Sequence, residues 1–318
     1  MISMNKKTIS YIGLFFVVFV WGLSPLLTLQ LYQFYSPTIR VCFADIILVI
    51  TYTILSKNHL KEFNMNYIKV GVPTGLFLSL ANITQKIGLL YTTPAKYAFL
   101  ETFSCITVPI LMFILVKKKP KVTTIIASFL CLISAFVLNG MTLTGTSWGI
   151  GEILCALSGL LYGFNIAGTG IYAKKLHTTL YLATQSLISF VVSLASTVLF
   201  HVITLPTEFG TQIPIEQIKF SFHPLHIGAV ILLTLICSAL CWTIRTNAMK
   251  YVDASIVAII MPFSAAITSI LSVLFGTDTF DLNLVLGVLL GLAAIFLSNY
   301  ADIFQKHSDS DHAPSANV

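Results

Sequence analysis

The sequence predicts an all-α polytopic membrane protein with ten transmembrane helices. Of its 318 residues, 56% are hydrophobic and only 9% are charged. With a mean hydropathy of +0.90, a soluble globule of this composition would carry an apolar surface. The apolar residues also fall into segments of about 20 residues, and a helix of that length matches the ~30 Å hydrocarbon core of a bilayer. We therefore predict a bundle that crosses the membrane repeatedly.

The predicted helices follow from hydropathy, and each ends at a residue that interrupts a membrane helix. In chain order the segments are 9–31, 37–55, 67–91, 94–116, 122–138, 149–172, 178–205, 225–247, 254–275 and 282–300. The interruptions between them are Ser36-Pro37, Lys57-Asn58, Thr93-Pro94, Lys119-Pro120, Asn139-Gly140, Lys174-Lys175, a loop at 206–224 ending in His223-Pro224, Lys250, and Asp278 with Asp281. Proline and glycine break helices, and charged side chains are excluded from the hydrocarbon core.

Basic residues collect in every second gap between the segments. Fourteen of the 18 lie on one predicted side: Lys6, Lys7, Lys57, Lys61, Lys69, Lys117, Lys118, Lys119, Lys121, Lys174, Lys175, Arg245, Lys250 and Lys306. By the positive-inside rule, this predicts a multi-pass protein of the cell membrane with both termini in the cytoplasm. The net charge of +6 is then a signal of topology, and we expect no nucleic-acid partner.

No separate soluble domain is expected. The apolar stretch after Lys7 is too long for a signal peptide and lacks a cleavage site, so it is read as an uncleaved first span. Residues 305–318 are polar and are predicted to form a disordered cytoplasmic tail. The six cysteines fall inside the spans without the spacing of a disulfide framework or a metal site. We therefore expect no metal and no cofactor.

A weak internal repeat divides the chain into two halves. A shift of 160 residues places Gln85–Val116 on Arg245–Gly276 with six identities, among them Tyr91 with Tyr251 and Phe103 with Phe263. Each half, 1–140 and 141–304, holds five predicted helices. Because five is odd, the second half must enter the membrane from the opposite side, which predicts inverted repeats around a shared cavity.

Several short motifs recur at characteristic places in the predicted spans: Phe19-Val20-Trp21-Gly22, Arg40, Gln85-Lys86-Ile87-Gly88-Leu89 with Tyr91, and Ala95 with Ala98. Together they resemble the drug/metabolite transporter superfamily, in particular its EamA-type members with ten spans. The resemblance implies two five-helix repeats with a cavity lined by the first, third, fourth, sixth, eighth and ninth spans. It also implies secondary transport of small organic solutes. The essential glutamate in the first span of related small multidrug exporters has no counterpart here.

Ionisable residues within the spans need a specific reason, because each costs roughly 2.5–3.5 kcal/mol to insert. Glu101 is the leading candidate: it either binds an ammonium group or carries a coupling proton in the cavity, or it is neutralised by Lys86 across adjacent spans. Asp45 is interpreted as a structural charge with a partner on a neighbouring helix. Arg40 is interpreted in the same way or as a side chain that reaches the headgroups.

Aromatic and amide side chains complete the predicted site. Tyr97 and Glu101 are four residues apart and share one helix face, and with Trp21 and Tyr162 they suggest an aromatic cage for an amine or amino acid. Trp242 either joins this site or belongs to the interfacial aromatic belt. Asn82 and Asn165 either contact the solute or join helices by hydrogen bonds. Gly287 and Gly291 form a small-residue face for packing within the chain or in a dimer.

These observations favour a secondary active transporter that moves an amino acid, amine or related metabolite by alternating access, with protons as a candidate coupling ion. The expected partners are this solute and the lipid bilayer, and the expected state is a monomer or homodimer. An intramembrane enzyme is a weaker alternative because nearly all histidines lie in predicted loops. A receptor or scaffold without transport activity is the other alternative.

Overall fold

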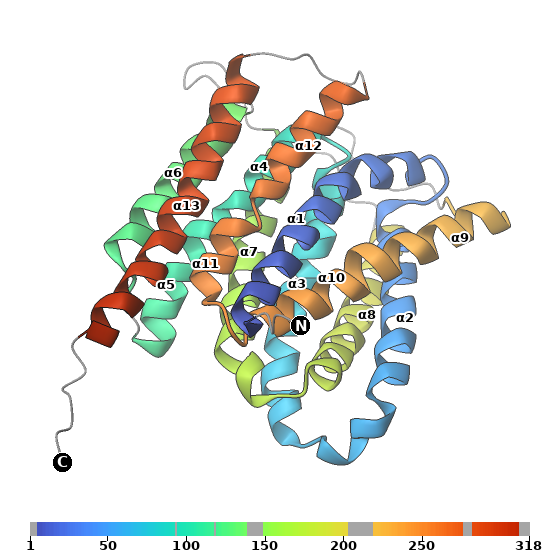
Figure 1. Ribbon diagram of the computed structural model, residues 1–318. Helices are drawn as coiled ribbons and strands as arrows, with labels where there is room; N and C mark the ends of the chain where they lie inside the picture. The colour runs from blue at the N-terminus through green and yellow to red at the C-terminus, as the bar shows by residue number, and fades with distance from the viewer. Residues whose placement is uncertain are drawn as a thin grey trace, which may run out of the picture.

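Helices form the whole of the ordered architecture seen in the computed structural model, which describes residues 5–92, 94–117, 119–138, 149–202, 219–275 and 282–311 (Figure 1). Each predicted apolar segment is helical over most of its length. Six stretches are long and apolar enough to cross a membrane: Lys6–Leu31, Pro37–Glu62, Ile150–Lys175, Thr178–Phe200, Pro224–Ala248 and Ala254–Leu271. The chain is therefore a multi-pass membrane protein. That all ten segments cross the membrane stays a prediction.

The first half contains six α-helices and two 3₁₀ turns among its described residues. They are α1 (Lys6–Leu31), α2 (Pro37–Ser56), η1 (Lys57–Glu62), α3 (Met65–Gly88), α4 (Pro94–Leu100), η2 (Glu101–Phe103), α5 (Ser104–Val116) and α6 (Val122–Leu138). The side chain of Asn5 caps α1 and that of Asn64 caps α3 by accepting backbone hydrogen bonds. Lys117 ends α5 in the left-handed conformation, with a φ of 57°.

The second half follows the same pattern with one irregular turn. Its elements are α7 (Ile150–Tyr172), η3 (Ala173–Lys175), α8 (Thr178–Val202), α9 (Pro224–Leu233), η4 (Thr234–Leu240), α10 (Cys241–Ala248), α11 (Ala254–Ile260), α12 (Phe263–Leu274) and α13 (Leu282–Asp311). The segment η4 is π-helical, so one continuous span runs through α9, η4 and α10.

One predicted boundary needs correction. The helix α13 continues to Asp311, past the start of the predicted disordered tail at Gln305. No proline or glycine interrupts the chain between Gly291 and Pro314, so nothing local ends the helix where the sequence turns polar. The predicted division between the halves at 140 and residues 312–318 lie outside the described residues.

Helices of the first half pack mainly on helices of the second (Figure 1). The helix α3 contacts both α7 and α8, α1 contacts both α10 and α12, α2 packs on α8, and α6 packs on α13. The predicted small-residue face of α13 is used inside the chain, where Ser134 Oγ on α6 donates to the carbonyl of Gly287 at 2.6 Å. The halves are therefore interleaved.

The surface is apolar and the interior is unusually polar. Large side chains such as Phe16, Phe129 and Phe296 are exposed on the helices, as expected for faces in contact with lipid. Buried residues include two arginines and many serines and threonines. This distribution places the groups that could recognise a polar solute inside the bundle.

Contacts between loops define the two ends of the bundle. Lys6 lies 5.9 Å from the ring centroid of Tyr251, and Thr178 Oγ1 donates to Asn247 Oδ1 at 2.6 Å. These contacts bring together the start of α1, the α7–α8 connection and the α10–α11 turn, and with η1 they form what we call the lysine-rich end. At the opposite end, Tyr35 after α1 donates to the carbonyl of Ser221 before α9 at 2.8 Å.

Candidate functional site

A polar cavity lies between helices of both halves, with about 850 Å³ of empty space that includes open solvent. Its polar and aromatic lining comes from nine elements. In the first half, α1 gives Trp21 and Ser24, α2 gives Arg40 and Asp45, α3 gives Asn82, Gln85 and Lys86, and α4 and η2 give Tyr97 and Glu101. In the second half, α7 gives Tyr162, η4 and α10 give Thr234, Cys237, Ser238 and Trp242, and α12 gives Ser264 and Thr268. Arg40 lies at the start of α2 and Lys86 at the end of α3, so the cavity is displaced toward the end opposite the lysine-rich end.

The structure brings most of the predicted site residues together in this cavity. Trp21, Asn82, Lys86, Tyr97, Glu101, Tyr162 and Trp242 all line it. The spans that line it also match those implied by the family resemblance, with one addition. The helix α2 contributes Arg40 and Asp45, because its first turns face the gap between α3 and the α9–η4 segment.

Lys86 and Glu101 face the same cavity without forming an ion pair. Lys86 Nζ donates to the hydroxyl of Tyr97 at 3.0 Å and lies 5.4 Å from the centroid of that ring. Glu101 accepts a side-chain hydrogen bond from Gln85. No ion pair within 4.0 Å joins Lys86 to Glu101 in the described part of the chain. Both charges therefore remain available to a solute.

The two residues predicted as structural charges also line the cavity. Asp45 is 2% exposed and its Oδ2 accepts a hydrogen bond from Ser189 on α8 at 2.9 Å. Arg40 is 7% exposed and its Nε has no hydrogen-bond partner among the described residues. Its guanidinium therefore lies in the cavity rather than on the outer surface of the bundle.

Aromatic side chains form much of the remaining wall. The indole of Trp21 donates from Nε1 to the carbonyl of Cys237 at 2.7 Å. The hydroxyl of Tyr162 lies 2.6 Å from Asn82 Oδ1 and 2.9 Å from Gln85 Oε1. Trp242 is 7% exposed and faces the cavity, which is not the position of an interfacial belt residue.

Asn165 lies outside the cavity lining and joins helices below it. Its Nδ2 donates to the carbonyl of Thr74 at 3.0 Å, and its Oδ1 accepts from Arg245 Nη2 at 2.9 Å. Arg245 is 1% exposed. Counting it among the basic residues of an inner gap was therefore wrong, because it lies inside the bundle on α10. The internal repeat aligns Arg245 with Gln85, which lies within the predicted span 67–91, and this alignment indicates an interior position for Arg245.

The predicted fourth and ninth spans are each interrupted near the cavity, the fourth after α4 and the ninth after α11. The 3₁₀ turn η2 begins at Glu101, and α11 ends before a turn at Met261 and Pro262. Pro109 lacks the N–H that would bond the carbonyl of Cys105, and Ser128 Oγ donates to that carbonyl instead at 2.9 Å. Glu101 therefore lies at a helix interruption, and the carbonyl that Pro109 frees in the following helix α5 is satisfied by α6.

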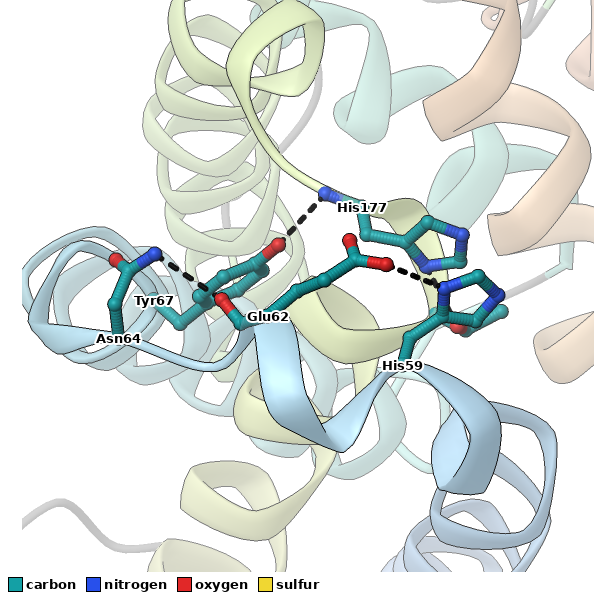
Figure 2. A network of polar contacts seen from close by, with 6 residues as sticks. His59, Glu62, Asn64, Tyr67 and His177 are labelled. Carbon is teal, nitrogen blue, oxygen red and sulfur yellow. Dashed lines mark hydrogen bonds and ion pairs between the residues drawn. The ribbon is translucent and has the colours of Figure 1, made fainter.

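A separate polar cluster joins the halves at the lysine-rich end (Figure 2). His59 Nδ1 and Glu62 Oε1 are 2.7 Å apart, and the rings of His59 and His177 stack with centroids 3.7 Å apart. The backbone N–H of His177 donates to the hydroxyl of Tyr67 at 3.0 Å. The hydrogen bond with His59 lowers the pKa of Glu62. Partial burial, reinforced by His59, lowers the pKa of His177.

Comparisons with known proteins agree with this architecture. A protein solved by crystallography has a similar fold, with a TM-score of 0.71 over 93% of this chain and 98% of that chain, at 13% sequence identity. No curated protein sequence matches the chain. Residues 149–300, which run from the start of α7 into α13, match the EamA-like transporter family. The second half of the chain is therefore similar to EamA-like transporters, a family of the drug/metabolite transporter superfamily.

Proposed function

We propose that the protein is a secondary active transporter that moves a small organic solute, an amino acid, amine or related metabolite, by alternating access. The observation that carries this proposal is the cavity lined by Arg40, Asp45, Lys86 and Glu101 inside an apolar bundle. Ionisable side chains at membrane depth are costly and mark solute or ion pathways. A purely structural bundle would not keep four of them around one space.

The chemistry of the lining favours a solute with both a charged and an apolar part. Glu101 and the rings of Tyr97 and Trp21 offer a carboxylate and aromatic faces to an ammonium group. Arg40 and Lys86 offer cations to an anionic group.

The arrangement of broken helices supports alternating access. Glu101, where the fourth span breaks, corresponds to Met261 in the repeat alignment, and the ninth span breaks at that residue. Transporters built from inverted repeats place discontinuous helices at corresponding positions beside the solute site. Because only the first break carries an acidic residue, we expect one charged site shared by both halves.

Solute flux in proteoliposomes tests the proposal. Purified protein would be reconstituted, loaded with a mixture of the common amino acids or of their decarboxylated amines, and assayed for counterflow of each labelled compound. Flux above that of protein-free vesicles is expected for at least one class. Stimulation by an imposed proton gradient would support proton coupling, and its absence would restrict the proposal to exchange. Absence of flux for every amino acid and amine tested would contradict the proposed solute class and favour a receptor or an enzyme.

A further inference from the structure

The chain contains only two arginines, and both are buried inside the bundle. Every exposed strong cation in the described chain is a lysine, whereas Arg40 is 7% exposed and Arg245 is 1% exposed. A guanidinium offers a planar fork of donors that matches a carboxylate, which a lysine ammonium does not. The sequence therefore uses arginine only at two interior positions, one in the cavity and one beyond it.

The surroundings of Arg245 leave its charge uncompensated. Its Nη2 donates to the neutral amide of Asn165 at 2.9 Å, and its Nε has no partner among the described residues. The groups that act electrostatically on Arg245 are the phenols of Tyr162 and Tyr181, the carboxyl group of Glu101 and the phenol of Tyr52, and none of them forms an ion pair with it among the described residues. Burying a guanidinium without a paired carboxylate is costly, so a function is the expected reason for keeping one.

Trp21 separates Arg245 from the cavity. The guanidinium lies 5.5 Å from the centroid of the Trp21 ring, and Trp21 lines the cavity whereas Arg245 does not. The indole is fixed by its hydrogen bond to the carbonyl of Cys237, which belongs to the π-helical segment η4. π-helical turns recur at functional positions because their register differs from that of the flanking α-helix.

Other unpaired polar atoms lie on α10, which carries Arg245, and on α8, which contacts α10. The hydroxyl of Thr246, next to Arg245 on α10, has no hydrogen-bond partner among the residues that the structure describes, and neither does Gln185 Oε1 on α8. The amide of Gln185 donates to Tyr181 at 2.8 Å. Buried polar groups are normally paired. Three unpaired atoms on contacting helices are expected where a polar ligand binds in another conformation.

We infer that Arg245 is a second anion subsite, closed off by the Trp21 indole in this conformation, which takes the carboxylate of the solute when the bundle opens toward the lysine-rich end. This inference rests on the proposed transport function. Arg40 and Lys86 hold the carboxylate in the cavity, and Arg245 receives it after Trp21 moves aside. This movement breaks the hydrogen bond from Trp21 to the carbonyl of Cys237 and the cation–π contact of Trp21 with the guanidinium of Arg245.

Arginine-specific labelling tests the subsite without knowledge of the solute. Phenylglyoxal would be applied to the purified protein, and mass spectrometry would follow the two arginine-containing peptides separately. We expect Arg245 to react about tenfold more slowly than Arg40, and W21A to remove most of this protection. The matched control is W242A, which removes an indole from the same cavity but not from the face of Arg245. Equal reactivity of Arg245 in W21A and W242A would overturn the closure by Trp21.

Acetate, the simplest carboxylate, then tests anion binding at Arg245. In W21A, acetate is expected to slow the labelling of Arg245 by about threefold or more relative to sodium chloride of equal ionic strength. Absence of protection would overturn the subsite. Acetate protection of Arg40 in the same samples reports the cavity itself, so the two arginines serve as internal references for each other.

Transport assays separate this inference from the function on which it rests. We expect R245Q to slow amino-acid counterflow by about tenfold and to leave counterflow of the decarboxylated amines within about twofold, with partial recovery in R245K. Equal losses for both solute classes would contradict a carboxylate subsite. If the wild-type protein moves neither class, the proposed solutes are wrong, and the acetate experiment still decides whether Arg245 binds an anion.

Discussion

Buried charges in this protein are held mainly by neutral partners. Lys86 bonds to Tyr97, Asp45 to Ser189 and Arg245 to Asn165. A neutral hydrogen-bond partner fixes the position of a charged group but does not cancel its charge. This arrangement is costly in a membrane protein, and it leaves the charges available to a solute that can compensate them.

The first prediction concerns Glu101. The substitution E101Q keeps the shape of the side chain and its ability to contact Gln85, but removes its charge and its capacity to carry a proton. We expect solute counterflow in proteoliposomes to fall about tenfold or more. The control is E152Q: Glu152 is a buried acidic residue, but it caps α7 through the backbone N–H of Gly149 and lies outside the cavity. Unchanged counterflow in E101Q would remove Glu101 from the proposed mechanism.

At the scale of single elements, α7 supports the break that carries Glu101. A Cβ atom at Gly159 would lie 2.5 Å from the carbonyl oxygen of Leu100 and 3.2 Å from the Cα of Glu101. Both of these are backbone atoms, so a side chain at this position would force α7 and η2 apart. The glycine is therefore required by the close approach of two main chains.

The second prediction follows from this contact. We expect G159A to lower the thermal midpoint of the detergent-solubilised protein and to reduce counterflow, because the clash of the new methyl group with backbone atoms costs about 1–3 kcal/mol. The matched control is G228A on α9, where a Cβ meets no atom within 4 Å. There the substitution is expected to be neutral or to stabilise by up to about 1 kcal/mol. Equal melting of the two variants would contradict the role assigned to Gly159.

The histidine cluster at the lysine-rich end predicts a local response to pH. Partial burial keeps the pKa of His177 in the folded protein below its ordinary value of 6.5. Protonation of His177 therefore favours the state in which η1 and the α7–α8 connection are separated. The contact between η1 and the α7–α8 connection is complete above that value and weakens as the pH falls below it. His59, Glu62 and Lys250 are the charged or titratable groups that act on His177. Glu62 stays ionised in this range because its pKa is lowered.

Hydrogen exchange checks this third prediction. Amides of Lys57–Glu62 are expected to exchange faster at about pH 5.5 than at about pH 7.5, after correction for the intrinsic rate. In H177F a ring still stacks on His59 but cannot be protonated, so the corrected difference should disappear. The control is H226F, because His226 stacks on Phe34 at the opposite end. A pH response that persists in H177F would assign the effect to another group.

At the scale of the whole molecule, the two halves of the chain pack together as one interleaved bundle. Because α1 packs on α10 and α12 while α3 packs on α7 and α8, neither half can form its core alone. Contacts between loops of both halves bring Lys6 and the connections that carry Lys174, Lys175 and Lys250 to one end. The distribution of charge seen in the sequence therefore corresponds to one physical face of the bundle.

The fourth prediction concerns orientation. With ten crossings and the lysine-rich end in the cytoplasm, reporters fused to either terminus should be cytoplasmic. Fluorescent-protein fusions are expected to fluoresce and alkaline-phosphatase fusions to be inactive at both ends. A phosphatase fusion placed before Lys219 serves as the positive control because this loop is predicted to be external. Opposite results at the two termini would require an odd number of crossings.

The sequence by itself determined the helical class, the positions of the apolar segments and the residues that are costly in a membrane. These are one-dimensional properties, because helix rise and bilayer thickness together set the length of a span. The face shared by Tyr97 and Glu101 was also visible, since residues four apart lie on one side of a helix.

Only the tertiary structure decided which polar groups meet. Asp45 and Arg40, which were predicted as structural charges, line the cavity, whereas Asn165, a predicted site residue, does not. Arg245 lies in the interior and is not one of the loop cations. The orientation of a helix about its own axis depends on the helices that contact it, and here those contacts come from the other half of the chain. No local pattern around Arg245 could show that Trp21, more than two hundred residues earlier, would cover it.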